Sequence, residues 1–262
     1  MPDTRRPPID MKALIAAARA AGEAILQVYA GDFAVETKGD DSPLTEADRR
    51  SNAVLLTALR SQYPDIPVIS EETKVRGYDE RRAWSACWLI DPLDGTKEFI
   101  KRNGEFTVNI ALIVDGEPAA GVVHQPTTET TYFARRGHGA FRQQGVQPPV
   151  PIEGGTHYSK ASDVTVVASR SHLTPEVEAF VSDLRNQGKT VSFRSAGSSL
   201  KICLVADGQA SVYPRFGPTM EWDTAAAHAI AAEAGKQLLD CHTRQPLVYN
   251  KENLLNPWFI VE

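Results

Sequence analysis

The sequence lacks the marks of a secreted, disulfide-rich protein. Cys87, Cys203 and Cys241 are its three cysteines; they lie far apart, are odd in number and match no zinc-ligand spacing. We therefore expect a reducing compartment, the cytoplasm. No apolar run is long enough to span a bilayer. Residues 1–8 are polar and proline-rich, so we expect no signal peptide either.

The sequence also lacks an excess of basic residues. Its 262 residues carry a formal net charge of −5, and no basic stripe is present, so we expect no nucleic acid polymer as a partner. A small anionic substrate is still compatible with this charge, because the charge around the site decides its binding. Repeats and low-complexity segments are absent, and the length allows one large domain or two closely packed halves.

The most informative stretch is residues 87–99, CWLIDPLDGTKEF. Its apolar start predicts a buried strand, and Pro92, which cannot pair in a ladder, predicts the end of that strand. Asp91 and Asp94 would then lie at the carboxyl end of a strand, where α/β sheets bind their ligands. Gly95 and Thr96 can begin a short helix whose free N–H groups suit a phosphate.

Two carboxylates on one turn repel each other. At about 4 Å and an effective dielectric near 20, the cost is roughly 4 kcal/mol. Exposure to water lowers this cost, protonation of one acid removes it, and a bound cation reverses it. Ligands that are all oxygen suit Mg²⁺ or Ca²⁺, and the neighbouring phosphate-type turn favours Mg²⁺. An acidic turn that only caps a helix is the alternative.

Three further acids stand at the ends of predicted elements. Asp48 completes a capping-box pattern that begins at Thr45, so it either caps the helix or points at the same pocket as the strand-end acids. Glu71 follows a short apolar run and could be a solvated surface residue. Asp223 lies in the first turn of an alanine-rich helix, where the macrodipole favours an acid. Together with the phosphate-type turn, these acids favour one shared site.

The rest of the chain divides into two halves that we expect to form one compact unit. Residues 1–153 predict an α+β, metal-binding half, and in residues 154–262 strands alternate with helices, which predicts an α/β half that completes the substrate site. Segment 147–155, rich in proline and glycine, is the expected boundary. The expected helices are 10–29, 45–63, 174 onward, 200–206 and 221–234, and the expected strands are 33–37, 66–69, 87–90, 107–114, 119–124, 130–134, 165–168, 191–193 and 210–213.

On these motifs the chain resembles the inositol monophosphatase superfamily of Mg²⁺-dependent, lithium-sensitive phosphatases. The superfamily motifs are Ser-Glu-Glu at 70–72, Asp-Pro-Leu-Asp-Gly-Thr at 91–96 and Trp-Asp-Thr-Ala-Ala at 222–226. Segments 97–112, 169–172, 197–201 and 213–219 are similar to the CysQ-type 3′(2′),5′-bisphosphate nucleotidases of that superfamily. The resemblance covers nearly the whole chain.

The resemblance implies a layered αβαβα sandwich of the inositol monophosphatase and sugar phosphatase type, of mixed α+β and α/β class. It implies two or three Mg²⁺ per site, held by four carboxylates and one backbone carbonyl, those of Glu71, Asp91, Asp94, Asp223 and Leu93. Thr96 would orient a metal-bound water, with Asp48 as its carboxylate partner and Glu71 as a further catalytic residue. The backbone of Gly95 and Thr96 would hold the scissile phosphate.

The resemblance also places a group of residues near the substrate. Those near the nucleoside and its other phosphate are Ser169, Arg170, Ser171, His172, Gly197, Ser198, Lys201 and Arg215, and those around the scissile phosphate are Glu71, Leu93, Asp94, Gly95, Thr96 and Asp223. Lys201 and Arg215 could instead be ordinary solvated cations, and His172 could cap the next helix. Ala227 stands where the family often has glycine, which puts the local pocket shape in question.

Three functions follow from this reading. The first is a nucleotidase that hydrolyses adenosine 3′,5′-bisphosphate to AMP and phosphate, with the related sulfated nucleotide as a second substrate. We expect a metal-activated water to attack phosphorus directly, without a phosphoenzyme. The second is a broader inositol or sugar phosphatase, and the third is a non-catalytic nucleotide-binding protein. We expect a monomer rather than a dimer, and the resemblance allows peripheral association with the inner membrane.

Overall fold

The computed structural model describes residues 9–37, 43–168 and 174–262. Its α-helices are α1 (Met11–Tyr29), α2 (Glu46–Gln62), α3 (Tyr78–Arg81), α4 (Thr96–Ile100), α5 (Pro175–Asn186), α6 (Leu200–Ala206) and α7 (Glu221–Glu233). Its strands are β1 (Val35–Thr37), β2 (Pro43–Thr45), β3 (Val68–Ser70), β4 (Ala86–Asp94), β5 (Thr107–Val114), β6 (Glu117–Gln125), β7 (Thr130–Arg135), β8 (Ala140–Gln144), β9 (Val150–Ile152), β10 (Asp163–Ala168), β11 (Thr190–Ser195), β12 (Tyr213–Arg215), β13 (Leu238–Asp240) and β14 (Phe259–Val261).

A seven-stranded sheet forms the centre of the molecule. Its strand order is β3-β4-β5-β6-β7-β8-β9; β3 and β4 are parallel and the other neighbours are antiparallel. Side chains alternate between the two faces of β4, as the period of a strand requires. Trp88 and Ile90 pack on one face with α1 and α2, and Cys87 and Leu89 pack on the other with α6 and α7.

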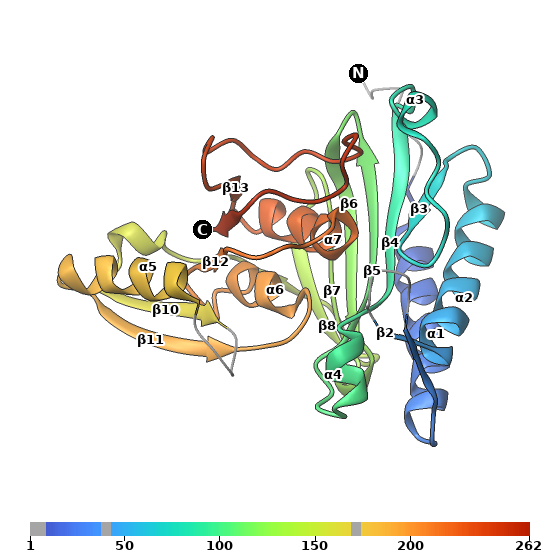
Figure 1. Cartoon of the computed structure of the whole chain (residues 1–262), viewed down its shortest axis with the longest axis horizontal. Helices are drawn as coiled ribbons and strands as arrows, with labels where there is room; N and C mark the ends of the chain where they lie inside the picture. Colours follow the sequence, from blue (N-terminus) through green and yellow to red (C-terminus); the bar gives the residue numbers. More distant parts are fainter. Residues whose placement is uncertain (1–8, 38–42, 169–173) are drawn as a thin grey trace.

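Smaller sheets form a second β layer on the far side of α6 and α7 (Figure 1). One is the parallel pair β10–β11, and the other has the order β12-β14-β13. Helix α5 and strand β10 share a separate hydrophobic core, to which α5 contributes Val177, Val181 and Leu184. The layers are therefore helix, sheet, helix, sheet and helix, which confirms the predicted αβαβα sandwich.

Helix α7, from the second half of the sequence, packs closely on the sheet formed by the first half. Its residues 225–227 are alanines that are at most 1 % exposed. A Cβ on Gly121 of β6 would lie 2.2 Å from the carbonyl oxygen of Ala226, so only glycine permits this approach. Small residues on both sides thus bring the start of α7 close to the end of β4.

Strand β4 differs from the expectation that it ends at Pro92. Asp91 pairs with Asn109 and Asp94 pairs with Thr107, with an irregularity between the two acids. Pro92 lies in this bulge and takes part in no ladder pair, so its missing N–H does not interrupt the strand. The hydroxyl of Ser51 on α2, which is buried, donates to the Pro92 carbonyl at 2.6 Å and holds the bulge in place.

Most other predicted elements are confirmed within a few residues. Asp10 caps α1, and Thr45 with Asp48 forms the capping box of α2. The expected strand at 210–213 is wrong in its bounds, because β12 begins at Tyr213 and Val212 makes only an isolated bridge to Val166. Among the described residues, no helix combines the length and the apolar composition needed to cross a membrane.

Candidate metal and phosphate site

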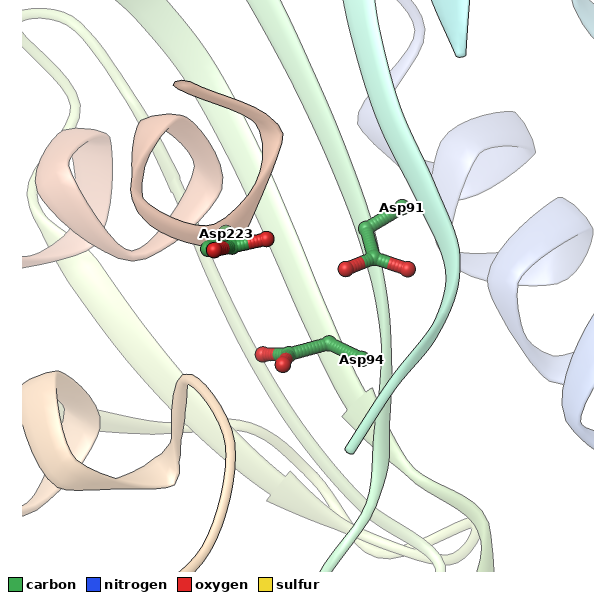
Figure 2. A group of neighbouring side chains, drawn as sticks. All are labelled: Asp91, Asp94 and Asp223. Carbon is green, nitrogen blue, oxygen red and sulfur yellow. The ribbon is translucent and has the colours of Figure 1, made fainter. Parts of the chain in front are cut away.

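Three acidic side chains from distant parts of the chain meet between β4 and α7. One carboxylate oxygen each from Asp91, Asp94 and Asp223 lies within 4.8 Å of the other two. Figure 2 shows these carboxylates converging on one space, two from the strand and one from the first turn of the helix. Asp91 is 1 % exposed, so water does little to screen the repulsion between these groups.

The protein environment raises the pKa of two of these acids, Asp91 and Asp223. Burial raises the pKa of Asp91 well above its ordinary value, and the charges of Glu71 and Asp94 raise it further. Burial, followed by the charge of Asp94, raises the pKa of Asp223 to about 8. A divalent cation bound among these oxygens would compensate both effects, and a set of ligands that are all oxygen fits Mg²⁺ or Ca²⁺.

Glu71 lies next to this cluster. β3 runs parallel to β4, and the Glu71 N–H donates to the carbonyl of Ile90 at 3.3 Å. After burial, its charge is the largest cause of the raised pKa of Asp91. It is not part of the tight group of three oxygens, so its predicted role as a ligand stays a prediction.

Four hydrogen-bond donors surround one oxygen of Asp94. Its Oδ2 accepts the hydroxyl of Ser198 at 2.6 Å, and the backbone N–H and hydroxyl of Ser199, each at 2.7 Å. The side-chain amide of Asn109 donates a fourth bond at 3.2 Å. The orientation of the carboxylate is therefore set by β5 and by the segment before α6, and within the described ranges its Oδ1 has no hydrogen bond and could bind a metal.

The residues that orient Asp94 were missed in the sequence analysis, apart from Ser198. Asn109 is a buried amide on β5, a strand that is otherwise mostly apolar, and it also donates to the Ser199 hydroxyl at 2.8 Å. The hydroxyl of Thr107 contacts that of Ser198 at 2.5 Å. Polar residues at inward positions of an apolar strand were the available signal, because buried polar groups need partners.

Asp48 and Thr96 are brought together as expected. One oxygen of Asp48 accepts the N–H and hydroxyl of Thr45 in the capping box, at 2.7 and 2.6 Å. The other oxygen accepts the hydroxyl of Thr96 at 3.3 Å, and that hydroxyl is also 3.4 Å from the Leu93 carbonyl oxygen. Asp48 therefore caps α2 with one oxygen and meets Thr96 with the other, and its predicted catalytic role stays a prediction.

The predicted phosphate turn has the expected backbone. Gly95 precedes α4 with a φ of +95°, a conformation that favours glycine. Gly197, on the facing segment, is placed so that a Cβ would lie 2.6 Å from the Glu105 carbonyl oxygen. Both glycines therefore allow close approach of backbone segments beside the acids.

A pocket of about 490 Å³ extends from the acids toward basic side chains. Asp94 and Asp223 line one part of it, and Lys201 and Arg215 line it as well. The Lys201 ammonium lies 5.9 Å from the centre of the Tyr213 ring. The Arg215 Nη2 donates to the Pro218 carbonyl at 3.1 Å, while its buried Nε has no hydrogen-bond partner among the described residues.

The predicted nucleoside site falls partly outside the described part of the chain. Ser169, Arg170, Ser171 and His172 lie outside the described residues. Gly95 and Ser198 line the pocket, and Ala168 and Thr174, which flank the segment 169–173, line it too.

The chain is similar to known proteins along nearly its whole length. A family model described as "Inositol monophosphatase family" matches residues 10–258. The chain is 48 % identical to "3′(2′),5′-bisphosphate nucleotidase CysQ" of Salmonella typhimurium, over 93 % of this chain and 96 % of that one. It is also 48 % identical to the protein of the same name from Escherichia coli K12, with the same two coverages.

Solved structures show the same fold. The crystal structure of CysQ from Bacteroides thetaiotaomicron, described as a bacterial member of the inositol monophosphatase family, matches with a TM-score of 0.82 and 46 % identity, over 96 % of each chain. An IMPase of Thermotoga maritima matches with a TM-score of 0.76 at 22 % identity, over 96 % of this chain and 90 % of that one, which bears on the fold alone.

Proposed function

The chain belongs to the inositol monophosphatase family, and we propose that it is a 3′(2′),5′-bisphosphate nucleotidase. It hydrolyses the 3′-phosphate of adenosine 3′,5′-bisphosphate, which yields AMP and phosphate, and the related sulfated nucleotide is a second substrate. One observation carries the proposal: Asp94 and Asp223 line the same pocket as Lys201 and Arg215. An acidic metal site thus opens onto a cationic region that suits a second phosphate.

The metal is proposed to be Mg²⁺, two or three per site. Asp91, Asp94 and Asp223 would hold it, with Glu71 and the Leu93 carbonyl as further ligands. When bound, such ions activate a water for attack on phosphorus and neutralise the charge that spreads over the phosphoryl group. No protein nucleophile is required, so we expect no phosphorylated residue during turnover.

Asp48 and Thr96 are proposed to handle the proton of the attacking water. A threonine hydroxyl is a poor base by itself, so it needs a carboxylate beside it. The 3.3 Å contact between the Thr96 hydroxyl and Asp48 provides that carboxylate. Because the other oxygen of Asp48 is tied to Thr45, the carboxylate is held in a fixed orientation toward Thr96.

Substrate contacts divide between the two ends of the pocket. We propose that the backbone of Gly95 and Thr96 holds the scissile phosphate and that Lys201 and Arg215 bind the other one. Ser198 lines the pocket, but its hydroxyl is 2.6 Å from Asp94, so we assign it mainly to orienting that carboxylate. Ser169, Arg170, Ser171 and His172 keep their predicted place near the nucleoside.

The cellular setting stays a prediction. Cys87, Cys203 and Cys241 are free thiols in the structure, which agrees with a reducing compartment and a cytoplasmic enzyme. A monomer, inhibition by lithium and peripheral association with the inner membrane also remain proposals.

Phosphate release from a panel of substrates tests this function. Adenosine 3′,5′-bisphosphate, its sulfated relative and inositol 1-phosphate should be compared, each with Mg²⁺ and with EDTA. We expect the highest kcat/KM on the bisphosphate and no turnover with EDTA. Faster turnover of inositol 1-phosphate would favour the broader phosphatase, and nucleotide binding without phosphate release would favour a binding protein.

A further inference from the structure

Asp223 is the only one of the three acids in Figure 2 that lies on α7. Its Oδ2 accepts the backbone N–H of Met220 at 2.8 Å, and its own N–H contacts the Met220 carbonyl oxygen at 3.2 Å. Met220 is the N-cap of the helix, a position where serine, threonine, aspartate or asparagine usually supplies a side-chain oxygen. A thioether sulfur accepts hydrogen bonds only weakly, so the backbone at the start of α7 depends on partners from elsewhere in the chain.

A segment near the end of the sequence supplies those partners. The Leu254 carbonyl accepts the N–H of Glu221 at 2.9 Å. The backbone N–H of Asn256 donates to the Thr219 carbonyl at 2.8 Å. This segment therefore lies beside the backbone that leads into Asp223.

The side-chain amide of Asn256 reaches residues on both sides of Asp223. It is 5 % exposed, and its Nδ2 lies 2.8 Å from the Met220 carbonyl oxygen, 3.0 Å from the Thr224 hydroxyl and 3.3 Å from the Thr219 hydroxyl. A backbone carbonyl can only accept, so the contact with Met220 assigns the nitrogen end of the amide. Met220 precedes the acid by three residues and Thr224 follows it directly, so one amide holds the chain before and after the acid.

Asn256 acts as a donor toward these residues. The nearest acceptors of its two amide hydrogens are the Met220 carbonyl and the Thr224 hydroxyl. Its Oδ1 is buried and has no hydrogen-bond partner within the described ranges. Leucine has nearly the same shape without the amide donors, so Asn256→Leu removes the side-chain hydrogen bonds and preserves most of the packing.

The segment that Asn256 holds also contacts the basic part of the pocket. The carbonyl of Pro218, the residue before Thr219, accepts Nη2 of Arg215 at 3.1 Å. Asn256 binds Thr219 through both its backbone and its side chain. Arg215 and Asp223 therefore both depend on the short stretch of backbone that Asn256 fixes.

We propose that Asn256 is a positioning residue of the metal site. It holds the Met220 backbone so that the Met220 N–H orients Asp223, and through Thr219 it steadies the carbonyl that binds Arg215. Mutation of a residue that orients a metal ligand lowers metal affinity or activity by about 10- to 100-fold. The inference rests on the metal role of Asp223 in the proposed function.

Hydrogen exchange in the metal-free protein tests the first step without enzyme activity. The chain has three methionines, so ¹⁵N-methionine labelling of the full chain gives few amide signals, and Met220→Leu identifies that of Met220. We expect this amide to exchange about tenfold faster in Asn256→Leu than in the wild type, the equivalent of one lost hydrogen bond. The amide of Met11, on α1, serves as the internal reference.

Isothermal titration of Mg²⁺ into metal-free protein tests the second step. The Mg²⁺ affinity of Asn256→Leu should be about tenfold lower than that of the wild type. Thr131→Val is the matched control, since it removes a buried hydroxyl of β7 that lies 2.9 Å from His124 Nδ1, and neither residue lines the active-site pocket. This control loses a buried hydrogen bond but should keep the Mg²⁺ affinity of the wild type.

Two results would overturn the inference: unchanged exchange of the Met220 amide, or Mg²⁺ affinity of folded Asn256→Leu within about twofold of the Thr131→Val control. Asn256→Ser, which shortens the side chain, is judged by the same two measurements if Asn256→Leu does not fold. Wild-type protein that binds no Mg²⁺ would overturn the metal site of the proposed function together with this inference. The two failures are therefore distinguishable.

Kinetics at saturating Mg²⁺ test the contact with Arg215. In Asn256→Leu, the KM for the bisphosphate should rise by about fivefold, the effect of one weakened hydrogen bond, with a smaller change for inositol 1-phosphate, which has a single phosphate. Equal changes on the two substrates would overturn the part of the inference that concerns Arg215.

Discussion

Replacement of Ser199 by alanine tests whether the orientation of Asp94 controls metal binding. The Ser199 hydroxyl is 2.7 Å from Asp94 Oδ2 and 2.6 Å from the carbonyl oxygen of Asp223. It also accepts the amide of Asn109 at 2.8 Å. One hydroxyl proton cannot serve both oxygens at once, so the change removes one donor that two metal-site residues share, and it also takes an acceptor away from Asn109.

The size of the effect follows from what remains. Asp94 Oδ2 would keep the Ser199 backbone N–H at 2.7 Å, the Ser198 hydroxyl at 2.6 Å and the Asn109 amide at 3.2 Å. Loss of one hydrogen bond to a charged group costs about 1.5–3 kcal/mol. Loss of a residue that orients a metal ligand lowers metal affinity by about 10- to 100-fold. Because three donors remain, we expect about a tenfold loss in Mg²⁺ affinity.

Isothermal titration of Mg²⁺ into metal-free protein measures this affinity without substrate. The Mg²⁺ dependence of phosphate release should shift by a similar factor, with kcat partly recovered at high Mg²⁺. Ser192→Ala is the matched control, since the hydroxyl of this exposed serine on β11 contacts only the Thr165 hydroxyl within the part of the chain that the structure describes. If folded Ser199→Ala binds Mg²⁺ within about twofold of the control, the orientation argument is wrong.

Four further predictions concern single side chains. Asp94→Asn should remove most activity because it weakens metal binding, and near-normal turnover at saturating Mg²⁺ would count against the site. Thr96→Ala should lower kcat by about a hundredfold with a smaller change in KM; steady-state kinetics in which KM changes most would contradict its role beside the water. Lys201→Ala should reduce kcat/KM for the bisphosphate more than for AMP or inositol 1-phosphate, and equal losses would remove Lys201 from the specificity role. Burial lowers the pKa of His124 to about 4, below its unfolded value near 6.5, so its contribution to stability is present above pH 6.5 and is lost as the pH falls toward 4. In urea unfolding, the free energy of unfolding of the wild type should therefore fall by about 3 kcal/mol relative to that of His124→Gln over this pH range. A difference between the two proteins that does not depend on pH would refute this.

The sequence was sufficient where short-range signals decide structure. Asp10 and Thr45 mark the starts of α1 and α2 because a side-chain cap acts within one turn. The Asp115–Gly116 turn joins β5 and β6 as its residue types predict. The expectation at Pro92 failed for a reason that is not local. Whether a proline ends a strand or sits in a bulge depends on the neighbouring strand and, here, on the contact with Ser51 of α2.

By itself, then, the sequence determined the family, the order of the helices and strands, and which acids belong to the candidate metal site, because short contiguous motifs specify each of these. Only the tertiary structure decided that Asp94 is held by Ser199 and Asn109, from two separate segments. It also decided that Asp223, in the first turn of α7, meets the two acids of β4. Such pairings depend on how α7 and the segment before α6 pack against the sheet, and no local propensity of the chain encodes that packing.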